Sequence, residues 1–105
     1  MGKFKGGVMS DYKKALKLDP KDGHTHGNIA YLYERLDNDG EALKNADLAC
    51  KYELGYGCYT KGIINYNYYL QMKDNKYYTK AKDVLQRSCD SGYKDSCKKI
   101  STLGF

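Results

Sequence analysis

Apolar side chains recur along this chain at the three- and four-residue spacing of amphipathic helices, without the alternation that is typical of strands. Val8, Tyr12, Ala15 and Leu18 follow one another at these spacings, and Pro20 stops the stripe. The stretches "KDGHTHGNIAYLYERL" (21–36) and "GEALKNADLACKY" (40–52) repeat the pattern on either side of the turn "DNDG". The first half of the chain is therefore predicted to form three helices joined by short turns.

The second half continues the same pattern. After a glycine-rich corner, "ELGYG" (53–57), apolar positions predict a helix from about Gly57 to Gln71, and "KDNK" (73–76) forms the next turn. The stretch "YYTKAKDVLQRSCDS" (77–91) predicts a helix that Gly92 ends, and "KDSCKKISTLGF" (94–105) predicts a short last one. Helix pairs at a period of roughly 35–39 residues are the signature of an α-solenoid. We therefore expect an all-α fold built from antiparallel helix pairs.

The composition agrees with one folded domain that neither inserts into a membrane nor binds nucleic acid. The chain has 105 residues, enough for a single core, and its 12 tyrosines argue against disorder. Apolar runs stop at about four residues, far short of the ~20 that span a bilayer, and the opening "MGKFKGGVMS" lacks the apolar stretch of a signal peptide. The net charge of +5 comes from lysines interleaved with acids, which predicts solvated helix faces rather than a nucleic-acid patch.

Positions in the first half resemble the motif of a helical-repeat family. Val8, Tyr12, Ala15 and Pro20 match the second-helix positions and the closing proline of a tetratricopeptide repeat. The next unit is matched by a set that spans two helices: His26, Ile29, Ala30, Tyr33, Ala42, Ala46 and Ala49. From Ala42 onward the chain is more similar to a sibling family, the Sel-one-like repeats.

The four cysteines carry the most specific part of the resemblance. The stretches "ACKYELGYGC" (49–58) and "SCDSGYKDSC" (88–97) each hold two cysteines eight positions apart, and they are offset by 39 residues. This spacing resembles the cysteine-rich branch of the family, the Helicobacter cysteine-rich proteins, whose repeats end in A-C-x-x-G-x-x-x-x-C. The resemblance implies one disulfide between Cys50 and Cys58 and another between Cys89 and Cys97. Gly92 matches the glycine of the second motif, whereas Glu53 stands in its place in the first.

The resemblance also implies the domain organisation. It predicts a right-handed α-solenoid of about two and a half repeats, stapled by disulfides. We expect an N-terminal extension at 1–7 and a single repeat domain at 8–105. Within that domain, 8–20 and 94–105 would be half repeats, and 24–52 and 57–90 would be complete ones. Because a short array leaves an apolar face at its end helices, self-association through those helices is a further expectation.

From the residues alone, other chemistries stay open for the cysteines. Zinc sites and redox dithiols favour C-x-x-C spacing, which neither pair has, and free buried thiols need no spacing at all. The two histidines of "HTH" would point to different faces of a helix rather than to one metal. We therefore expect no metal and no cofactor. Because disulfides form in oxidising compartments, we expect a periplasmic or secreted protein whose leader lies outside this sequence.

Solenoids of this kind bind through a concave surface lined by the first helix of each pair. The expected ligand is a protein or peptide, because tyrosine rings give rigid contact area and amides can bond an extended backbone. In tetratricopeptide domains that clamp a terminal carboxylate, asparagines and basic residues recur at one position of successive first helices. That position here holds Asn28, Thr60 and Lys99. The residues expected on the concave surface are Asn28, Tyr31, Glu34, Tyr59, Ile63, Tyr66, Lys98, Lys99 and Thr102.

A catalytic alternative follows from the same resemblance, because members of the cysteine-rich branch are linked with penicillin binding and are often labelled β-lactamases. A serine acyl-enzyme of that type needs S-x-x-K together with S-D-N and K-T-G. Ser10, Ser91 and Ser96 each begin an S-x-x-K stretch, but neither companion motif occurs in the sequence. We therefore expect a noncatalytic binding scaffold or adaptor, and keep action on β-lactams or cell-wall peptides as the alternative.

Overall fold

The computed structural model describes the chain from Gly2 to Phe105, with side chains from Gly7 onward, and this part is all-helical, which confirms the all-α part of the predicted fold. Its helices are α1 (Gly2–Leu18), α2 (Gly23–Arg35), α3 (Asp39–Tyr52), α4 (Tyr56–Met72), α5 (Asn75–Asp90) and α6 (Lys94–Leu103). The segment expected as an extension at 1–7 belongs to α1 from Gly2 onward, and Met1 lies outside the described residues.

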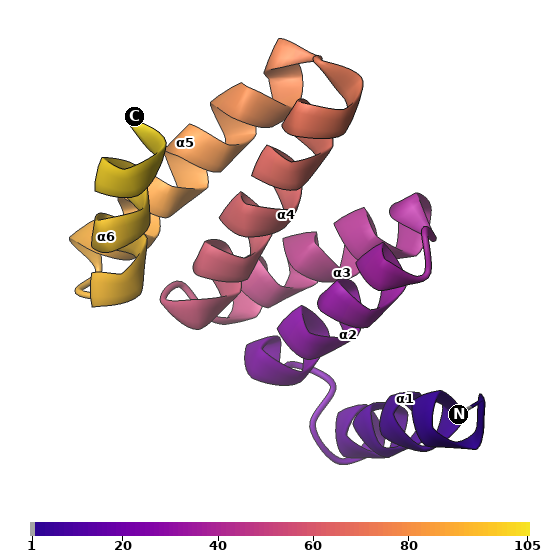
Figure 1. Ribbon diagram of the computed structural model, residues 1–105. Coiled ribbons are helices and arrows are strands. Elements are labelled where there is room, and N and C mark those ends of the chain that lie inside the picture. Colours follow the sequence, from indigo (N-terminus) through magenta and orange to yellow (C-terminus); the bar gives the residue numbers. More distant parts are fainter. Residues whose placement is uncertain (1) are drawn as a thin grey trace.

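Short polar side chains set the starts of three helices. Asp22 caps α2 by accepting hydrogen bonds from the backbone N–H of Thr25 at 3.2 Å and from the Thr25 hydroxyl at 2.9 Å. Asn38 and Asp74 cap α3 and α5 in the same way, each accepting from a backbone N–H in the first turn. Each capped start follows a short turn, so the chain reverses direction from one helix to the next (Figure 1).

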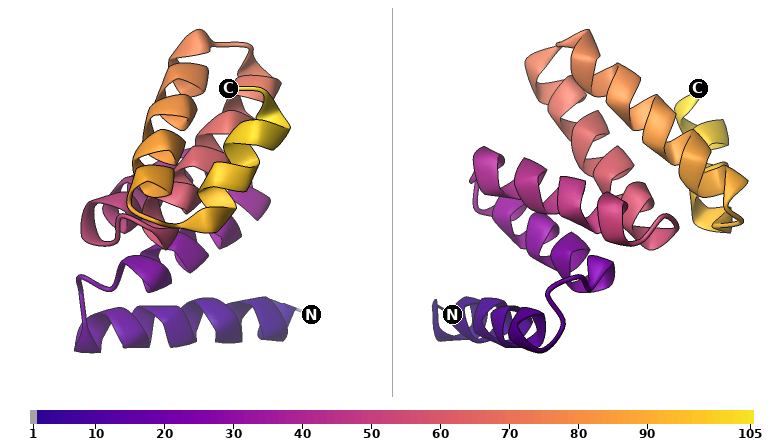
Figure 2. Two further views of the ribbon diagram at one scale, coloured as in Figure 1. Left: turned by 90° about the vertical axis from the view of Figure 1, so that its left-hand side faces the viewer. Right: turned by 180° about the vertical axis from the view of Figure 1, so that it is seen from behind.

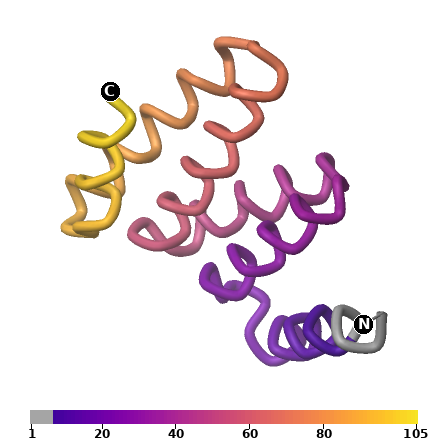
Figure 3. The backbone as a smooth tube through the Cα atoms, in the orientation of Figure 1, coloured from indigo at the N-terminus to yellow at the C-terminus, as the bar shows by residue number. Residues whose placement is uncertain are grey.

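The helices form a row in which each one packs against the next along the chain (Figure 3). Helix α2 also contacts α4, so the hairpins α2–α3 and α4–α5 are neighbours. Figure 1 shows α2 in front of α3 and α6 in front of α5, and the order is reversed in the view from behind in Figure 2. Helices α2 and α6 thus lie on the same side of the row with α4 between them, while α1 packs against α2 at one end.

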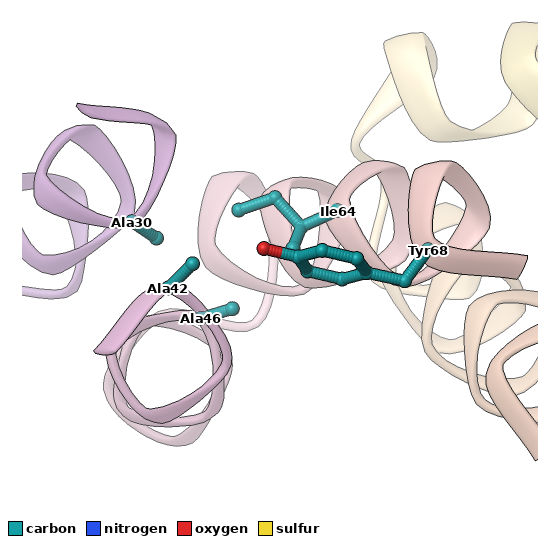
Figure 4. Close-up of a cluster of buried hydrophobic side chains, with 5 residues drawn as sticks. All are labelled: Ala30, Ala42, Ala46, Ile64 and Tyr68. Carbon is teal, nitrogen blue, oxygen red and sulfur yellow. The ribbon is translucent and has the colours of Figure 1, made fainter. Parts of the chain in front are cut away.

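A buried hydrophobic cluster lies where α2, α3 and α4 meet (Figure 4). Ala30, Ala42 and Ala46 are fully buried, and their small side chains let the three helices approach closely around Ile64 and Tyr68. Full burial of a side chain such as Ile64 contributes about 1.5–3 kcal/mol. The Tyr68 ring is 1% exposed, and its hydroxyl donates to a carboxylate at the start of α3 at 2.9 Å, so the polar atom of this core residue is also satisfied.

A buried polar network fixes the connection between α1 and α2 onto α3. The ring of His26 is almost fully buried, with Nε2 at 2.9 Å from the carbonyl oxygen of Pro20 and Nδ1 at 3.0 Å from Asn45 Oδ1. Because a carbonyl oxygen can only accept, Nε2 carries a proton. Asn45 Nδ2 donates in turn to the carbonyl of Glu41 at 2.9 Å. His26 therefore donates a hydrogen bond from Nε2 to the segment between α1 and α2 while its ring packs against α3 beside Asn45.

Cys50 and Cys58 form the first of the two predicted disulfides, which joins the end of α3 to the start of α4 with the Cα atoms 4.0 Å apart. Gly57 makes this close approach possible, since a Cβ at that position would overlap the carbonyl oxygen of Ala49. Glu53, which stands at the position of the motif glycine, has a φ of −144°. That is extended backbone, which any residue adopts, so the junction does not need a glycine there.

Cys89 and Cys97 form the second predicted disulfide, between the end of α5 and the start of α6, with the Cα atoms 4.8 Å apart. This junction turns differently from the first. Gly92 has a φ of +102°, a conformation that residues with a Cβ rarely adopt, and its N–H donates to the carbonyl of Cys89 at 2.9 Å. The glycine of the repeat motif is therefore required in the second junction but not in the first.

The two junctions also differ in the small residues that lie beside each disulfide. Ala49 and Gly57 occupy these positions in the first junction, and Ser88 and Ser96 occupy them in the second. Both serines are fully buried: the Ser96 hydroxyl donates to Ser88 Oγ at 2.7 Å, and the Ser88 hydroxyl donates to the carbonyl of Gly55 at 2.7 Å. This serine chain links α6 through α5 to the turn before α4.

Candidate functional site

Four half-buried tyrosines gather on the side of the molecule where α2, α4 and α6 lie, and we call them the tyrosine face: Tyr31, Tyr56, Tyr59 and Tyr93. The Tyr56 hydroxyl donates to Oδ1 of Asn28 at 2.8 Å, which connects α4 to α2. The rings of Tyr59 and Tyr93 are 5.5 Å apart, which connects α4 to the residue before α6. Side chains from three segments distant in sequence thus form one surface.

A histidine and a carboxylate border this surface at the end of Tyr56. The His24 ring stacks on the Tyr56 ring with 4.0 Å between centroids and 17° between planes. His24 Nδ1 lies 4.0 Å from Oε1 of Glu53, and both side chains are well exposed. The turn before α4 therefore brings an acidic group to the edge of the tyrosine face.

The surroundings of Tyr31, Tyr59 and Tyr93 keep these three hydroxyls neutral over the physiological pH range. Burial raises the pKa of Tyr31 to about 12. Burial and then the carboxylate of Asp95 raise the pKa of Tyr59, and the pKa of Tyr93 is raised by the same two causes in the same order. These side chains therefore offer uncharged rings and hydroxyls that can both donate and accept hydrogen bonds.

Of the residues expected on the concave surface, Tyr31 and Tyr59 belong to the tyrosine face, and Asn28 accepts a hydrogen bond from a third tyrosine of that face. Ile63 lies one helical turn after Tyr59 on α4 and is half-buried. Glu34 lies toward the other end of α2, where its Oε2 accepts a hydrogen bond from an asparagine of α4 at 2.9 Å. The α2 and α4 part of the prediction therefore falls along one pair of contacting helices.

Tyr66, also expected on the concave surface, belongs to a different aromatic cluster. Its ring centroid lies 5.8 Å from those of Tyr69 and Phe105, and Phe105 in turn lies 5.0 Å from Tyr78. These rings connect the middle of α4 to the first part of α5 and to the segment after α6. The Tyr66 ring therefore packs against other aromatic rings of this chain.

The expected contributions from α6 do not join the tyrosine face directly. Lys98 and Thr102 are exposed, Lys99 is half-buried, and the Thr102 hydroxyl donates to the carbonyl of Lys98 at 2.9 Å. Among the described side chains, no hydrogen bond or ion pair links these three to a tyrosine of the face. The α6 side chain whose charge helps, after burial, to raise the pKa of Tyr59 is Asp95, in the first turn of the helix.

The position that would hold a carboxylate clamp does not present its groups to a ligand. Thr60 is 0% exposed, and its hydroxyl faces Gly27 between α2 and α4 with no hydrogen-bond partner among the described residues. Asn28 is engaged by the Tyr56 hydroxyl. Of the three residues at this position only Lys99 remains, so the arrangement does not favour a terminal carboxylate.

Three residues of this site, His24, Tyr56 and Tyr93, are not among those predicted from the sequence. Tyr56 lies three positions before Tyr59, which is helical spacing, but the glycines of "ELGYG" predict a turn there, with the helix beginning at about Gly57. Tyr93 lies between a glycine and the expected start of α6 at Lys94, and no periodic signal marks it. A loop tyrosine of this kind is found only once the neighbouring helices are placed.

The serines of the S-x-x-K stretches are not arranged as nucleophiles. Ser10 is exposed on α1, and the Ser91 hydroxyl donates to the backbone carbonyl of Ser88 at 2.6 Å. Ser96 is 0% exposed, and its hydroxyl donates to another serine. An activated serine needs a base within hydrogen-bond reach. The hydrogen bonds of Ser91 and Ser96 thus give no support to a serine acyl-enzyme.

Comparisons with models of protein families, with characterised proteins and with solved structures found no match for this chain. None of the helices from Gly2 onward is both long and apolar enough to cross a membrane. Within the same part of the chain, no three side chains of His, Cys, Asp or Glu are grouped so that they could hold a metal ion.

Proposed function

We propose that this chain is a noncatalytic module that binds a protein or peptide segment on the tyrosine face, Tyr31, Tyr56, Tyr59 and Tyr93. The observation that carries the proposal is the convergence of these half-buried rings from α2, α4 and the turn before α6 on one surface. Tyrosine is enriched at interface hot spots because its ring gives a large rigid contact at low entropic cost. Its hydroxyl can also bond the backbone of an extended ligand.

The scaffold that we propose is a short right-handed α-solenoid of Sel-one-like type with about two and a half repeats. Two observations support it. The hairpins α2–α3 and α4–α5 are neighbours, with α2 and α6 on the same side of the row. The disulfides lie at the two turns that would separate repeats, after α3 and after α5. In such an array the first helices line the binding surface, and here α2 and α4 carry the tyrosines.

We place the protein in an oxidising compartment, either periplasmic or outside the cell. The support is that all four cysteines are paired in two disulfides. Cytosolic reductants would keep such thiols reduced, and each loop closure contributes to the stability of a domain with a thin core. The expected form of the natural protein therefore contains no titratable thiol under denaturing conditions.

The binding proposal can be tested with a displayed library of random peptides, selected on the oxidised protein. Selected peptides should bind in fluorescence anisotropy, and Tyr59→Ala should weaken them by about tenfold or more, as expected for an interface hot spot. Tyr59→Phe keeps the ring and should bind within a few-fold of the original protein. Lys82→Ala, at an exposed position on α5, is a control for a remote change. Selected peptides that bind Tyr59→Ala as well as the original protein would place the binding site elsewhere.

A further inference from the structure

The two disulfides differ in how far the surrounding helices cover them. Cys58 is 0% exposed and Cys50 is 8% exposed, and Val84 of α5 packs with both in a buried cluster. Cys89 and Cys97 are each only half-buried, so part of the second disulfide pair is open to solvent. Thiol–disulfide exchange begins when a thiolate reaches one of the two sulfur atoms, and its rate depends on that access. The geometry therefore favours attack on the second disulfide.

The helices that the two disulfides join also differ in what else holds them. Helices α3 and α4, on either side of the first disulfide, contribute Ala46, Ile64 and Tyr68 to the hydrophobic cluster. Helix α6, at the end of the row beside α5, has a single buried side chain, Ser96, and only ten residues (Figure 1). An isolated helix shorter than about 12–15 residues is marginal in water. Helix α6 therefore depends on its attachment to α5, and the second disulfide is the covalent part of that attachment.

Aromatic contacts flank α6 at both ends. Tyr93, directly before the helix, lies 5.5 Å from the ring of Tyr59, and Phe105, after it, lies 5.0 Å from the ring of Tyr78. None of these four residues is fully buried. Because both contacts belong to the segments that α6 connects, they would be lost together when α6 separates from α5. Departure of Tyr93 would also remove one ring from the tyrosine face.

We propose that Cys89 and Cys97 form a thiol–disulfide exchange site for a dithiol reductant, and that their reduction releases α6 while the other helices stay in place. A thiolate of the reductant attacks one sulfur, which breaks the S–S bond, forms a mixed disulfide and releases the other cysteine as a thiolate. The second thiol of the reductant then closes its own disulfide and releases the first cysteine. The cysteine pair gains two electrons and two protons, which the reductant loses. This inference does not rest on the proposed binding function.

The test of access uses the full oxidised chain under native conditions, with dithiothreitol as the reductant. Free thiols are blocked with N-ethylmaleimide at successive times and located by peptide mass spectrometry. Cys89 and Cys97 should be reduced at least about tenfold faster than Cys50 and Cys58. In urea that unfolds the chain, the two rates should agree within a few-fold, because both pairs are eight positions apart. Equal rates in the native chain, or the same preference in urea, would overturn the assignment of the exchange site to its exposure.

Hydrogen exchange then tests whether α6 is released. Once Cys89 and Cys97 are reduced and blocked, the amides of α6 should exchange almost as fast as in an unfolded chain, while α3 and α4 keep their protection. The variant Cys89→Ser/Cys97→Ser carries no blocking group and should behave in the same way, and Cys50→Ser/Cys58→Ser is the matched control that should keep α6 protected. Protection of α6 in both the reduced chain and Cys89→Ser/Cys97→Ser would refute the release. Loss of protection throughout α3 and α4 in those two samples would refute it as well, since the second disulfide would then hold the whole fold.

Discussion

Replacement of Gly57 by alanine is expected to destabilise this protein severely, although the same change at Gly40 should stabilise it. Both glycines are the second residue of their helix, α4 for Gly57 and α3 for Gly40. A Cβ at Gly57 would overlap the carbonyl oxygen of Ala49 and lie 3.0 Å from the backbone N of Cys50. A Cβ at Gly40 would have no neighbour within 4 Å. The two substitutions thus share their chemistry and differ in the space around them.

The magnitude follows from these surroundings. Alanine is favoured over glycine in a helix by about 0.5–1 kcal/mol, so Gly40→Ala should raise the free energy of unfolding by up to that amount. At Gly57 the obstacle is backbone, which cannot rotate away, and the disulfide between Cys50 and Cys58 holds the two helices together. Overpacking of this kind costs roughly 1–3 kcal/mol or more. For a domain of this size, each kcal/mol corresponds to about 4–8 °C in Tm.

Thermal unfolding followed by far-UV circular dichroism, with urea titrations on the same oxidised samples, measures both changes. Gly57→Ala should lower Tm by about 5–20 °C, and Gly40→Ala should leave it unchanged or raise it by a few degrees. If Gly57→Ala proved as stable as the original protein, α3 and α4 could not approach each other as described. A large loss in Gly40→Ala would show instead that glycine replacement is harmful in these helices for a reason other than space.

Three further outcomes are expected. Replacing both Cys89 and Cys97 by serine should lower the free energy of unfolding in urea by about 2.5 kcal/mol, the loop-closure contribution for so short a loop; no loss would contradict a stabilising role. Thr60→Val should raise the free energy of unfolding by up to about 1 kcal/mol, because the geometry gives the buried hydroxyl no hydrogen bond among the described residues; a decrease would show that it bonds the hydroxyl of Tyr31, which lies near it. Because burial raises the pKa of Tyr31 to about 12, the unfolded chain loses this proton first. Unfolding free energy should therefore fall as the pH rises from about 10 to 12, and less steeply in Tyr31→Phe.

The helices could be predicted from the sequence because apolar spacing involves residues within one or two turns of one another. The two disulfides were expected because the cysteine spacing resembles a known repeat motif, and the structure contains both. Helix α1 begins at Gly2 and so includes part of the segment expected as an extension at 1–7, where the sequence has no stripe of apolar side chains. Apolar periodicity can locate only the part of a helix that carries apolar side chains, and α1 begins before that part.

The candidate site was predicted only in part, because its surface depends on how the helices pack. Asn28, Tyr31 and Tyr59 were found by their positions on α2 and α4. Tyr93 was not predicted because it lies in a turn. Tyr66 was expected on the concave surface, and its contact with Phe105 could not be predicted because the two residues are distant in sequence. Neither contact leaves a periodic trace in the sequence.

The difference between the backbone turns at the two disulfides could not be predicted from the sequence either. Glu53 departs from the repeat motif, and only its backbone conformation shows that the departure is harmless. The hydrogen bond between Ser88 and Ser96 could not be distinguished in the sequence from two ordinary surface serines. The 39-residue interval aligns Ser88 with Ala49 and Ser96 with Gly57, but it does not predict that the two serine hydroxyls bond each other.

The placement of the disulfides has a consequence for how the protein opens. Each covalent link joins the end of one helix to the start of the next, α3 to α4 and α5 to α6, so these two junctions keep the helix ends close together when the helices around them open. Linear repeat arrays ordinarily lose repeats one after another from their ends. With both junctions closed, native-state hydrogen exchange should report a common opening free energy from α2 to α6, whereas α1, which no disulfide holds, should exchange independently. Reduction should convert this single transition into stepwise fraying.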